Sequence, residues 1–403
     1  METIDPQSTE RSTPPQQLWL LRATCFAQYA GIGLIWAYQT VWMKDQGMGE
    51  FFIGQISALA TVLTLLCGLT YGYLADHTGR PDRLVLVGTV LCSLTLVYFA
   101  RCRTAGDFVV YAVMVGVSMP LMLNMLTVLA MSAFGAGGGT GRKYGTYRVF
   151  GSLGYSLSTL VLPSFVPRIP GMLHIGAGLL LLSIVPLLAI RPAPRVEHTH
   201  GRLRPVLRNG ELMGFYVAVF FCALAAPAIF QFTPTYAREL GAGDRFIGVM
   251  AGMLGLVSIV GLPLSGWLAD RYGPRVLIVF PLLAQPLRAF SLSFVTSYEY
   301  ILLPRLLHTI TFAGLEVGAM LYVTRLAGPQ SRGTALAMYM ASGVLARALA
   351  SPVAGYLAQE AGYPAMFRIS AAAGALGVVI FLAVVVAERR STRHGDAAAS
   401  SAP

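Results

Sequence analysis

The chain has 403 residues, a net charge of +11 and five cysteines, and 55% of its residues are apolar while only 12% are charged. A soluble domain usually carries about 25% charged residues, and the mean hydropathy here is +0.64. This composition excludes a water-soluble domain and indicates an integral membrane protein. Because the cysteines show no Cys-x-x-Cys spacing, neither a disulfide framework nor a metal site is expected.

Twelve apolar stretches follow one another along the chain, and a helix that crosses a bilayer needs about 20 mostly apolar residues. The candidate spans are 17–43, 53–75, 84–100, 107–131, 148–166, 172–190, 211–235, 247–269, 276–294, 301–324, 334–356 and 365–387. We therefore expect an all-α membrane protein with twelve transmembrane helices in two six-helix bundles. Its predicted parts are a tail (1–16), a first bundle (17–190), a polar linker (191–210), a second bundle (211–387) and a tail without regular structure (388–403).

The basic residues predict the orientation of these spans. With both termini on one side, 18 Lys and Arg lie on that side and seven on the other, and the remaining four are Arg22, Arg288, Arg305 and Arg347, inside spans. The positive-inside rule then makes both termini cytoplasmic, in a multi-pass protein of the cell membrane. The excess charge is expected to contact anionic lipid headgroups rather than nucleic acid. Arg22 and Arg305 lie near span ends, where a long side chain can extend to the polar interface.

One segment of the chain occurs twice. Val41 to Gly79 recurs without gaps 194 residues later as Thr235 to Gly273, with ten of 39 positions identical and three more that keep their charge sign. Both copies have a Gly-x-Gly before an apolar span and Gly-x-Leu-Ala-Asp-x-x-Gly after it. Many solute carriers are built from duplicated halves, so the repeat predicts two related six-helix bundles.

Three stretches carry a family resemblance. The loop from Gly72 to Arg83, Gly-Tyr-Leu-Ala-Asp-His-Thr-Gly-Arg-Pro-Asp-Arg, resembles the loop signature of the major facilitator superfamily. The opening of the fifth span (144–155) and the stretch 307–313 of the tenth are similar to the phenylpropionate permease and nucleoside:proton symporter families. The resemblance implies the major facilitator fold, two pseudo-symmetric six-helix bundles, and a secondary transporter that is usually a monomer and uses no cofactor. It departs at Asn124, where relatives often carry Asp, and at Glu316, where they often carry His.

The loop signature has a physical meaning, because an aspartate at the end of one helix can face the N-terminus of another, where the helix dipole favours an anion. The resemblance implies that Asp76 faces the start of the eleventh span and that Asp270 faces Arg148. Such contacts would exist only with the cytoplasmic side closed. The alternative is an incidental acid in a basic loop. The expected gate residues are Asp76, Gly79, Arg80, Arg83, Asp270 and Arg148.

Polar side chains and helix-breaking residues occur together in spans one and seven, which the repeat makes equivalent. Glycine and proline are tolerated inside a membrane where neighbouring groups or a cavity satisfy the backbone, so these spans are expected to line a substrate cavity. The alternative is hydrogen bonding between packed helices. The candidate substrate-binding residues are Gln28, Tyr29, Tyr38, Asn124 and Gln231.

Span ten carries the ionisable residues that predict ion coupling. Arg305, His308, Phe312 and Glu316 fall within roughly 80° of one another on a helix, and an ionisable group at the bilayer centre costs about 2.5–3.5 kcal/mol. We expect Glu316 to take up a proton, His308 to relay it or hold substrate, and Arg347 to pair with the deprotonated acid. The alternatives are a static Glu–Arg pair and a histidine that only joins helices. Arg288 receives no role from the sequence.

Other signals are set aside. Gly135–Lys143 lacks the Gly-Lys-Ser/Thr of a phosphate loop, His198-x-His200 has no supporting acid or cysteine, and the Gly-x-x-x-Gly-Pro run of proton-driven drug antiporters is absent. The sequence thus predicts proton-coupled uptake of a small organic solute, such as an aromatic acid, a nucleoside or a sugar-like molecule. Its partners would be substrate, protons and membrane lipid. The alternatives are an exporter of drugs or metabolites on the same fold and, more remotely, a non-transporting membrane sensor.

Overall fold

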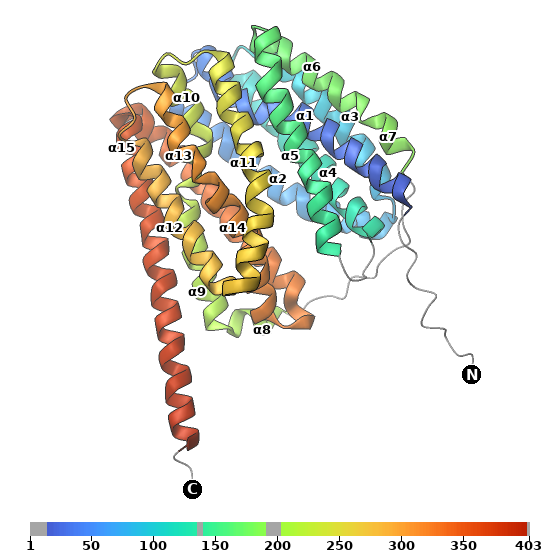
Figure 1. Cartoon of the computed structure of the whole chain (residues 1–403). Coiled ribbons are helices and arrows are strands. Elements are labelled where there is room, and N and C mark those ends of the chain that lie inside the picture. Colours follow the sequence, from blue (N-terminus) through green and yellow to red (C-terminus); the bar gives the residue numbers. More distant parts are fainter. Residues whose placement is uncertain (1–13, 135–139, 191–202, 401–403) are drawn as a thin grey trace, which may run out of the picture. The chain divides into compact units, whose positions relative to one another are not determined.

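The computed structural model describes residues 14–134, 140–190 and 203–400. These residues form helices and no strand (Figure 1). Most of the predicted N-terminal tail, the glycine-rich residues 135–139 and residues 191–202 of the predicted linker, with His198 and His200, lie outside the described residues. The helices are α1 (Pro15–Asp45), α2 (Glu50–Thr78), α3 (Pro81–Phe99), α4 (Ala105–Phe134), α5 (Thr140–Phe165), α6 (Ile169–Leu182), α7 (Ile184–Leu188), α8 (Leu203–Arg208), α9 (Gly210–Ala223), η2 (Ala228–Phe232), α10 (Thr233–Glu239), α11 (Asp244–Tyr272), α12 (Pro274–Leu292), η3 (Tyr298–Ile301), α13 (Leu302–Leu306), α14 (His308–Ala327), η4 (Pro329–Ser331) and α15 (Arg332–Ser400).

The helices account for the predicted spans. Ten stretches of the described residues are long and apolar enough to cross a membrane. One of them, within α15, contains the non-helical Gly362 (φ 81°) and so consists of two helices. With that division, and with α5 as a further helix of 26 residues, the twelve expected helices are present. The all-α membrane fold is therefore confirmed.

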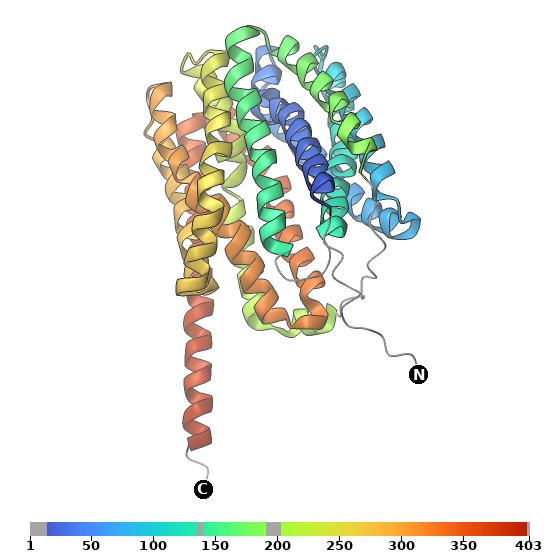
Figure 2. The ribbon, with the colours of Figure 1, turned by 45° about the vertical axis from the view of Figure 1, so that its right-hand side comes forward.

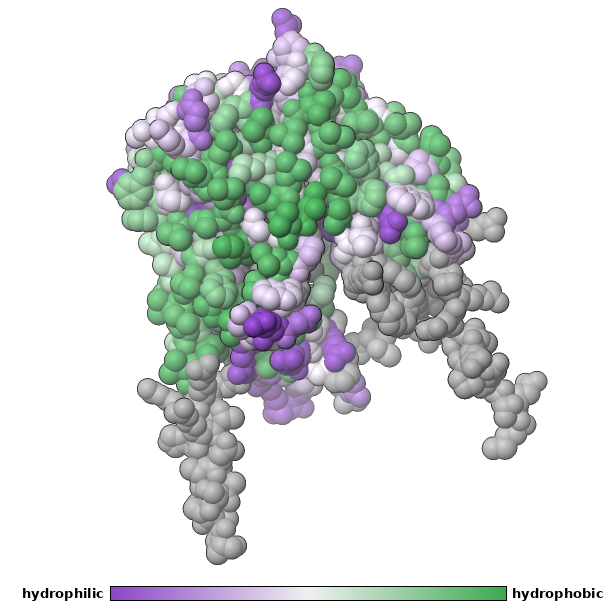
Figure 3. Space-filling model, in the orientation of Figure 1, coloured by the Kyte–Doolittle hydropathy of each residue, from purple (hydrophilic) through white to green (hydrophobic). Residues whose placement is uncertain are grey.

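The outer faces of these helices are apolar. Large hydrophobic side chains are exposed along them, such as Leu69 (66% exposed), Val260 (67%) and Val379 (61%). In the space-filling view, hydrophobic residues cover most of the visible helix faces and strongly hydrophilic ones gather toward the helix ends (Figure 3). Helices that expose this much apolar surface need lipid rather than water around them.

The end of the chain differs from its prediction. Residues after Glu388 were expected to lack regular structure, but α15 continues as a helix to Ser400. The tail follows directly from a regular helix, so no new helix has to be nucleated, and its arginines and alanines have high intrinsic helix propensity.

Two compact units make up the structure. The first comprises Met1–Gln39, Leu63–Glu197 and Asp244–Ile259, and the second comprises Thr40–Val62, His198–Gly243 and Val260–Pro403. The helices α1, α2 and α11 therefore each contribute residues to both units. In the first unit a core of buried side chains joins α1, α4, α5 and α7, and includes Leu21, Leu126, Leu129, Tyr147 and Leu187.

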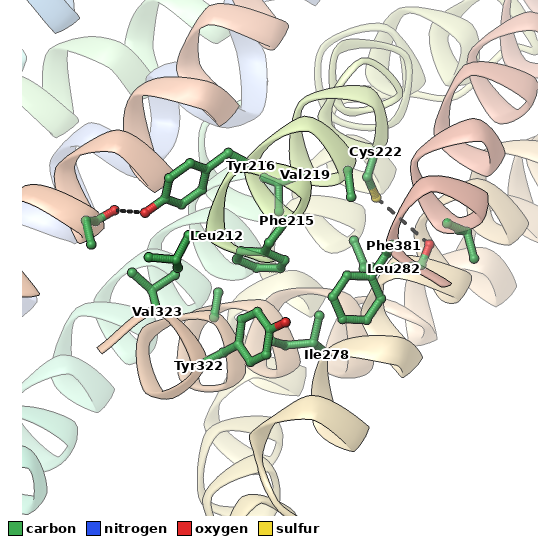
Figure 4. Close-up of a cluster of buried hydrophobic side chains, with 14 of the residues drawn as sticks. Leu212, Phe215, Tyr216, Val219, Cys222, Ile278, Leu282, Tyr322, Val323 and Phe381 are labelled. Carbon is green, nitrogen blue, oxygen red and sulfur yellow. Dashed lines mark hydrogen bonds between the residues drawn. The ribbon is translucent and has the colours of Figure 1, made fainter. Parts of the chain in front are cut away.

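The second unit has an aromatic core (Figure 4). The ring of Phe215 on α9 lies 4.9 Å from that of Tyr322 on α14 and 5.8 Å from that of Phe381 on α15, measured between centroids. The hydroxyl of Tyr216 donates to the carbonyl of Ala335, at 2.9 Å. Burying aromatic rings from three helices in one cluster stabilises this unit, because each ring removes a large apolar area from solvent.

Four of the repeated glycines end helices at equivalent positions. Gly47 and Gly241, equivalent positions that follow α1 and α10, have φ of 81° and 94°. Gly79 and Gly273, which follow α2 and α11, have φ of 64° and 81°. Residues with a side chain are strained at positive φ, whereas glycine ends a helix there at little cost. The repeat therefore encodes the same helix endings twice.

A further repeated pair, Gly54 and Gly248, permits close helix contacts. A Cβ at Gly54 would overlap the backbone of Ser351 and Pro352 on α15, in the second unit, and one at Gly248 would overlap the carbonyl of Thr159 on α5, in the first. In the first unit, α5 and the N-terminal part of α11 run side by side (Figure 2). There the Ser156 hydroxyl donates to the carbonyl of Gly252, at 2.9 Å. Small residues let helix backbones approach in this way in membranes.

Candidate functional site

Gln28 and Tyr29, on α1 of the first unit, lie in different surroundings. Gln28 is fully buried and its amide nitrogen donates to the Thr89 hydroxyl, at 2.9 Å, while its oxygen has no hydrogen-bond partner among the described residues. The ring of Tyr29 lies 4.3 Å from the guanidinium carbon of Arg148. The structure thus brings Tyr29 together with a residue predicted for the gate.

Tyr38 and Asn124 are also in the first unit. Tyr38 is fully buried and its hydroxyl donates to the backbone carbonyl of Asp244, at 2.9 Å, so it joins α1 to the start of α11. Asn124 on α4 is exposed, and its amide nitrogen lies close to Gly68 of α2. A binding role for either stays a prediction.

The loop residues predicted for the gate make local contacts. Arg80 precedes α3 and pairs with Asp82, at 3.2 Å. Gly79 ends α2 at positive φ. Arg83 and Asp270 are exposed, and the side chain of Asp76 lies outside the described part of the chain. The expected contacts of Asp76 and Asp270 would join the two units, so they stay predictions.

In the second unit, the seventh predicted span is not one continuous α-helix. The interruption falls where polar and aromatic residues lie. Between α9 and α10 the chain forms the π-helix η2, which contains Phe230 and Gln231. The side-chain oxygen of Gln231 is buried without a hydrogen-bond partner in the described residues. Single π-helical turns within α-helices occur frequently at functional sites, and Pro227 and Pro234 flank this one.

A charged cluster adjoins the π-helix. Arg288 on α12 is only 1% exposed, and its guanidinium carbon lies 4.9 Å from the ring centroid of Phe230. Its Nη1 lies 3.3 Å from Nδ1 of His308. Because a guanidinium can only donate hydrogen bonds, Nδ1 is the acceptor and the imidazole proton is on Nε2. His308 also packs edge-on against Phe230, at 5.6 Å, and stacks on Phe312, at 5.2 Å.

Arg305 belongs to the same cluster, which corrects its prediction. It was expected to extend to a polar interface, but it is 2% exposed, and its charge acts on both Arg288 and His308. The helical break between α13 and α14 falls at Leu307, between Arg305 and His308. We refer to Arg288, Arg305 and His308, with Phe230 and Phe312, as the arginine–histidine centre.

The remaining coupling candidates lie farther along α14 and on α15. Glu316 is exposed and Arg347 is partly buried. Both lie near enough to the Tyr339 hydroxyl for their charges to act on it. The structure thus gathers Glu316, Arg347 and Tyr339 in one region of the second unit. The proton-coupling roles of Glu316, His308 and Arg347 stay predictions.

Sequence reasoning missed a buried acid. Glu50, at the start of α2, is 6% exposed, pairs with Lys44 and accepts from the Tyr363 hydroxyl of α15, at 3.1 Å. The Lys44 and Glu50 spacing was visible in the repeat, but Tyr363 lies 313 residues away. In the residues that the structure describes, no three His, Cys, Asp or Glu side chains gather as a metal site requires.

Comparisons with known proteins agree with this architecture. Residues 18–369 match the MFS_1 like family. The maltose permease of Geobacillus stearothermophilus is 24% identical over 401 residues, which cover 90% of this chain and 93% of that protein. The probable 3-phenylpropionic acid transporter of Escherichia coli K12 is 23% identical, over 76% of this chain and 82% of that protein.

Two further matches extend the comparison. The multidrug resistance efflux pump PmrA of Streptococcus pneumoniae is 26% identical over 172 residues, so the match covers only 41% of that protein. The crystal structure of a variant of the nucleoside transporter NupG superposes with a TM-score of 0.81 at 14% identity, over 91% of this chain and 99% of that one. At this identity the likeness shows the fold alone.

The fold and these matches define the class of protein. The chain belongs to the MFS_1 like family and is a multi-pass membrane transporter of the major facilitator superfamily. The predicted family and fold class are confirmed.

Proposed function

We propose that this transporter imports a small organic solute by proton symport. Residues 17–190 and 211–387 would be the two bundles that rock in alternating access. Both termini would face the cytoplasm. The protein would lie in the cell membrane as a monomer. The linker 191–210 would connect the bundles.

The arginine–histidine centre is the observation that carries this proposal. Arg288, Arg305 and His308 are each at most 6% exposed, although an ionisable group inside a membrane protein is costly to bury. Such groups mark substrate pathways and proton relays. A helix that places His308 two turns before Glu316 has the residue types that proton coupling needs.

The proposed roles follow from these residue types. Glu316 takes up the coupling proton and His308 relays it or holds substrate. Arg347 compensates the charge of Glu316 after deprotonation, and the Tyr339 hydroxyl, on which both charges act, connects them. A static arrangement of Glu316 and Arg347 that only fixes α14 against α15 is the alternative.

The substrate would contact residues of both bundles. Buried amide oxygens of Gln28 and Gln231 without partners in the described residues support a role in hydrogen bonding to a solute, because such an oxygen is costly to leave unsatisfied. The further proposed contacts are Tyr29, Tyr38 and Asn124. Likeness to proteins named as transporters of 3-phenylpropionic acid, maltose and nucleosides supports an aromatic acid, a sugar-like molecule or a nucleoside.

The gate would use the repeated loops. Asp76, with Gly79, Arg80 and Arg83, would engage the start of α15 when the cytoplasmic side is closed. Asp270 would engage Arg148 in the equivalent place. Release of Arg148 from Tyr29 would accompany that change, since the guanidinium now lies on the tyrosine ring.

The test is uptake into proteoliposomes of labelled 3-phenylpropionate, uridine and maltose under an inward proton gradient. We expect Glu316→Gln to abolish concentrative uptake while substrate exchange continues, because exchange needs binding and reorientation but no net proton movement. Glu360→Gln is the matched control, since Glu360 is an exposed glutamate of α15. Concentrative uptake by Glu316→Gln with an unchanged pH dependence would show that Glu316 is not the coupling site.

A second candidate is proton-driven export on the same fold. Likeness to the pneumococcal efflux pump PmrA over part of the chain favours it. The direction of proton-driven flux separates the two functions. A proton-driven exporter moves its substrate into vesicles while protons move out. A symporter moves substrate and protons into the vesicles together.

A further inference from the structure

Among the described residues of the second unit, no acidic side chain balances the charge of Arg288. Arginine stays protonated in proteins, and this side chain is 1% exposed. In the described part of the chain its polar contact is the neutral side of His308, and its Nε has no hydrogen-bond partner. The face of Phe230 adds a cation–π contact, but a ring does not compensate a full charge. A buried cation without a carboxylate partner is a site that an anion can complete.

The neighbours of Arg288 make the site more positive. Arg305 is also buried and acts electrostatically on Arg288. His308 offers its Nε2 proton as a further donor, because Nδ1 already accepts from Arg288. An arginine fork with a nearby imidazole N–H suits the two oxygens of a carboxylate, which a guanidinium can bind through two parallel hydrogen bonds.

The aromatic residues indicate what the anion carries. Phe230 and Phe312 both contact the His308 ring, one edge-on and one stacked. Phe230 is 37% exposed and Phe312 is partly exposed, whereas the charged groups are covered. An anion that reached Arg288 would therefore lie with its remaining atoms against these two rings.

We propose that the arginine–histidine centre binds the carboxylate of an organic anion with an apolar or aromatic body, which makes an organic monocarboxylate the substrate class of this transporter. This inference rests on the proposed function. Arg288 forms the ionic contact, His308 orients the carboxylate, and Phe230 and Phe312 contact the body. Among the solutes considered above, it selects the acid over the nucleoside and the sugar.

Thermal unfolding of the purified full-length protein tests the inference. The probes are 3-phenylpropionate and its neutral amide, 3-phenylpropionamide, at constant ionic strength. A ligand that binds the folded state raises Tm by mass action. We expect the acid to raise Tm and the amide to have little effect. Equal responses to both probes, or a response to neither, would overturn the anion site.

Variants of Arg288 identify the contact. Arg288→Gln should weaken binding of the acid roughly 10- to 100-fold, as expected for loss of a hydrogen bond to a charged group. Arg288→Lys should retain part of the response, since it keeps the charge but not the fork. Arg368→Gln is the matched control: Arg368 also lies near a ring, 5.8 Å from Phe294, but it is exposed.

A purely structural role for Arg288 gives the opposite pattern. If the arginine only stabilised the fold, Arg288→Gln would lower the Tm of the ligand-free protein and leave the response to the acid intact. We expect a ligand-free Tm no lower than that of the wild type, because the substitution removes a buried charge without a carboxylate partner. The comparison of acid with amide on the wild type needs no variant, so it decides the matter even if a variant does not fold.

Transport assays separate this inference from the proposed function. Selective binding of the acid without proton-driven uptake would support the anion site and contradict symport. Proton-driven uptake that treats acid and amide alike, and that Arg288→Gln does not change, would support symport and contradict the anion site.

Discussion

The two copies of the repeat share backbone geometry, but their charge contacts are not identical. Gly47 and Gly241 end their helices at positive φ, and Gly54 and Gly248 each allow a helix to approach closely. The charges at equivalent positions have the same signs, but Arg238 reaches an acid of the other copy. In the first copy Lys44 pairs with Glu50, whereas its equivalent Arg238 pairs with Asp45 of the first copy, at 3.1 Å.

This difference separates what folds the protein from what gives it chemistry. Glycine positions are fixed by sterics, so both copies need them for the same helix endings and contacts. Charge pairs depend on which side chains face each other, and the contacts of Lys44 and of its equivalent Arg238 differ in this respect. The arginine–histidine centre lies in the second unit, whereas Arg148 of the first unit lies on the ring of Tyr29.

The largest effects are expected from filling the glycine contacts. Gly54→Leu and Gly248→Leu should each destabilise the protein by about 1–3 kcal/mol or more, because the obstructing atoms are backbone and cannot move aside easily. Thermal unfolding in detergent measures the effect. Gly178→Leu is the control, since a Cβ there meets no atom within 4 Å. Equal losses at the two positions would confirm the shared geometry, and no loss at either would show that the close contacts do not matter for stability.

Much of the fold follows from the sequence because apolar length alone predicts a span. The repeat predicted two related halves. Its glycines recur because the helix endings and close helix contacts at those positions require them. Arg288 could not be given a role, because its partners Phe230 and His308 lie on other helices, and apolar periodicity does not say which helices meet. The π-helix at Phe230 had only the prolines 227 and 234 as a signal, and these predict irregularity without its form.

The candidate site was harder to predict than the fold for the same reason. The sequence placed His308, Phe312 and Glu316 on one face of a helix, and the first two do stack. The predicted span boundaries placed Arg305 near the end of a span, but the burial of its side chain depends on tertiary packing. The partner of Glu50 was invisible, since Tyr363 comes from a helix near the other end of the chain.

An intermediate effect is expected from the charge pairs in which the two copies differ. Glu50→Gln should destabilise the protein by about 1–3 kcal/mol, because it weakens charge-assisted hydrogen bonds of a buried carboxylate with Lys44 and Tyr363. Asp244→Asn should cost less, since Asp244 is only partly buried and the substitution keeps the backbone carbonyl that accepts from Tyr38. Both are measured as changes in Tm. Equal costs would mean that the two acids are equivalent after all.

The smallest effects are expected at the shared helix endings. Gly47→Ala and Gly241→Ala place a side chain at positive φ with open space around it, so the cost is backbone strain alone, about 1–2 kcal/mol. Gly178→Ala is the control, since Gly178 is an exposed residue inside α6 with open space around it, and alanine is the better helix former. Its Tm should equal or exceed that of the wild type. If Gly47→Ala is tolerated while Gly241→Ala is not, the cost of a side chain at positive φ differs between the two copies. The equivalent helix endings would then not be equivalent in energy.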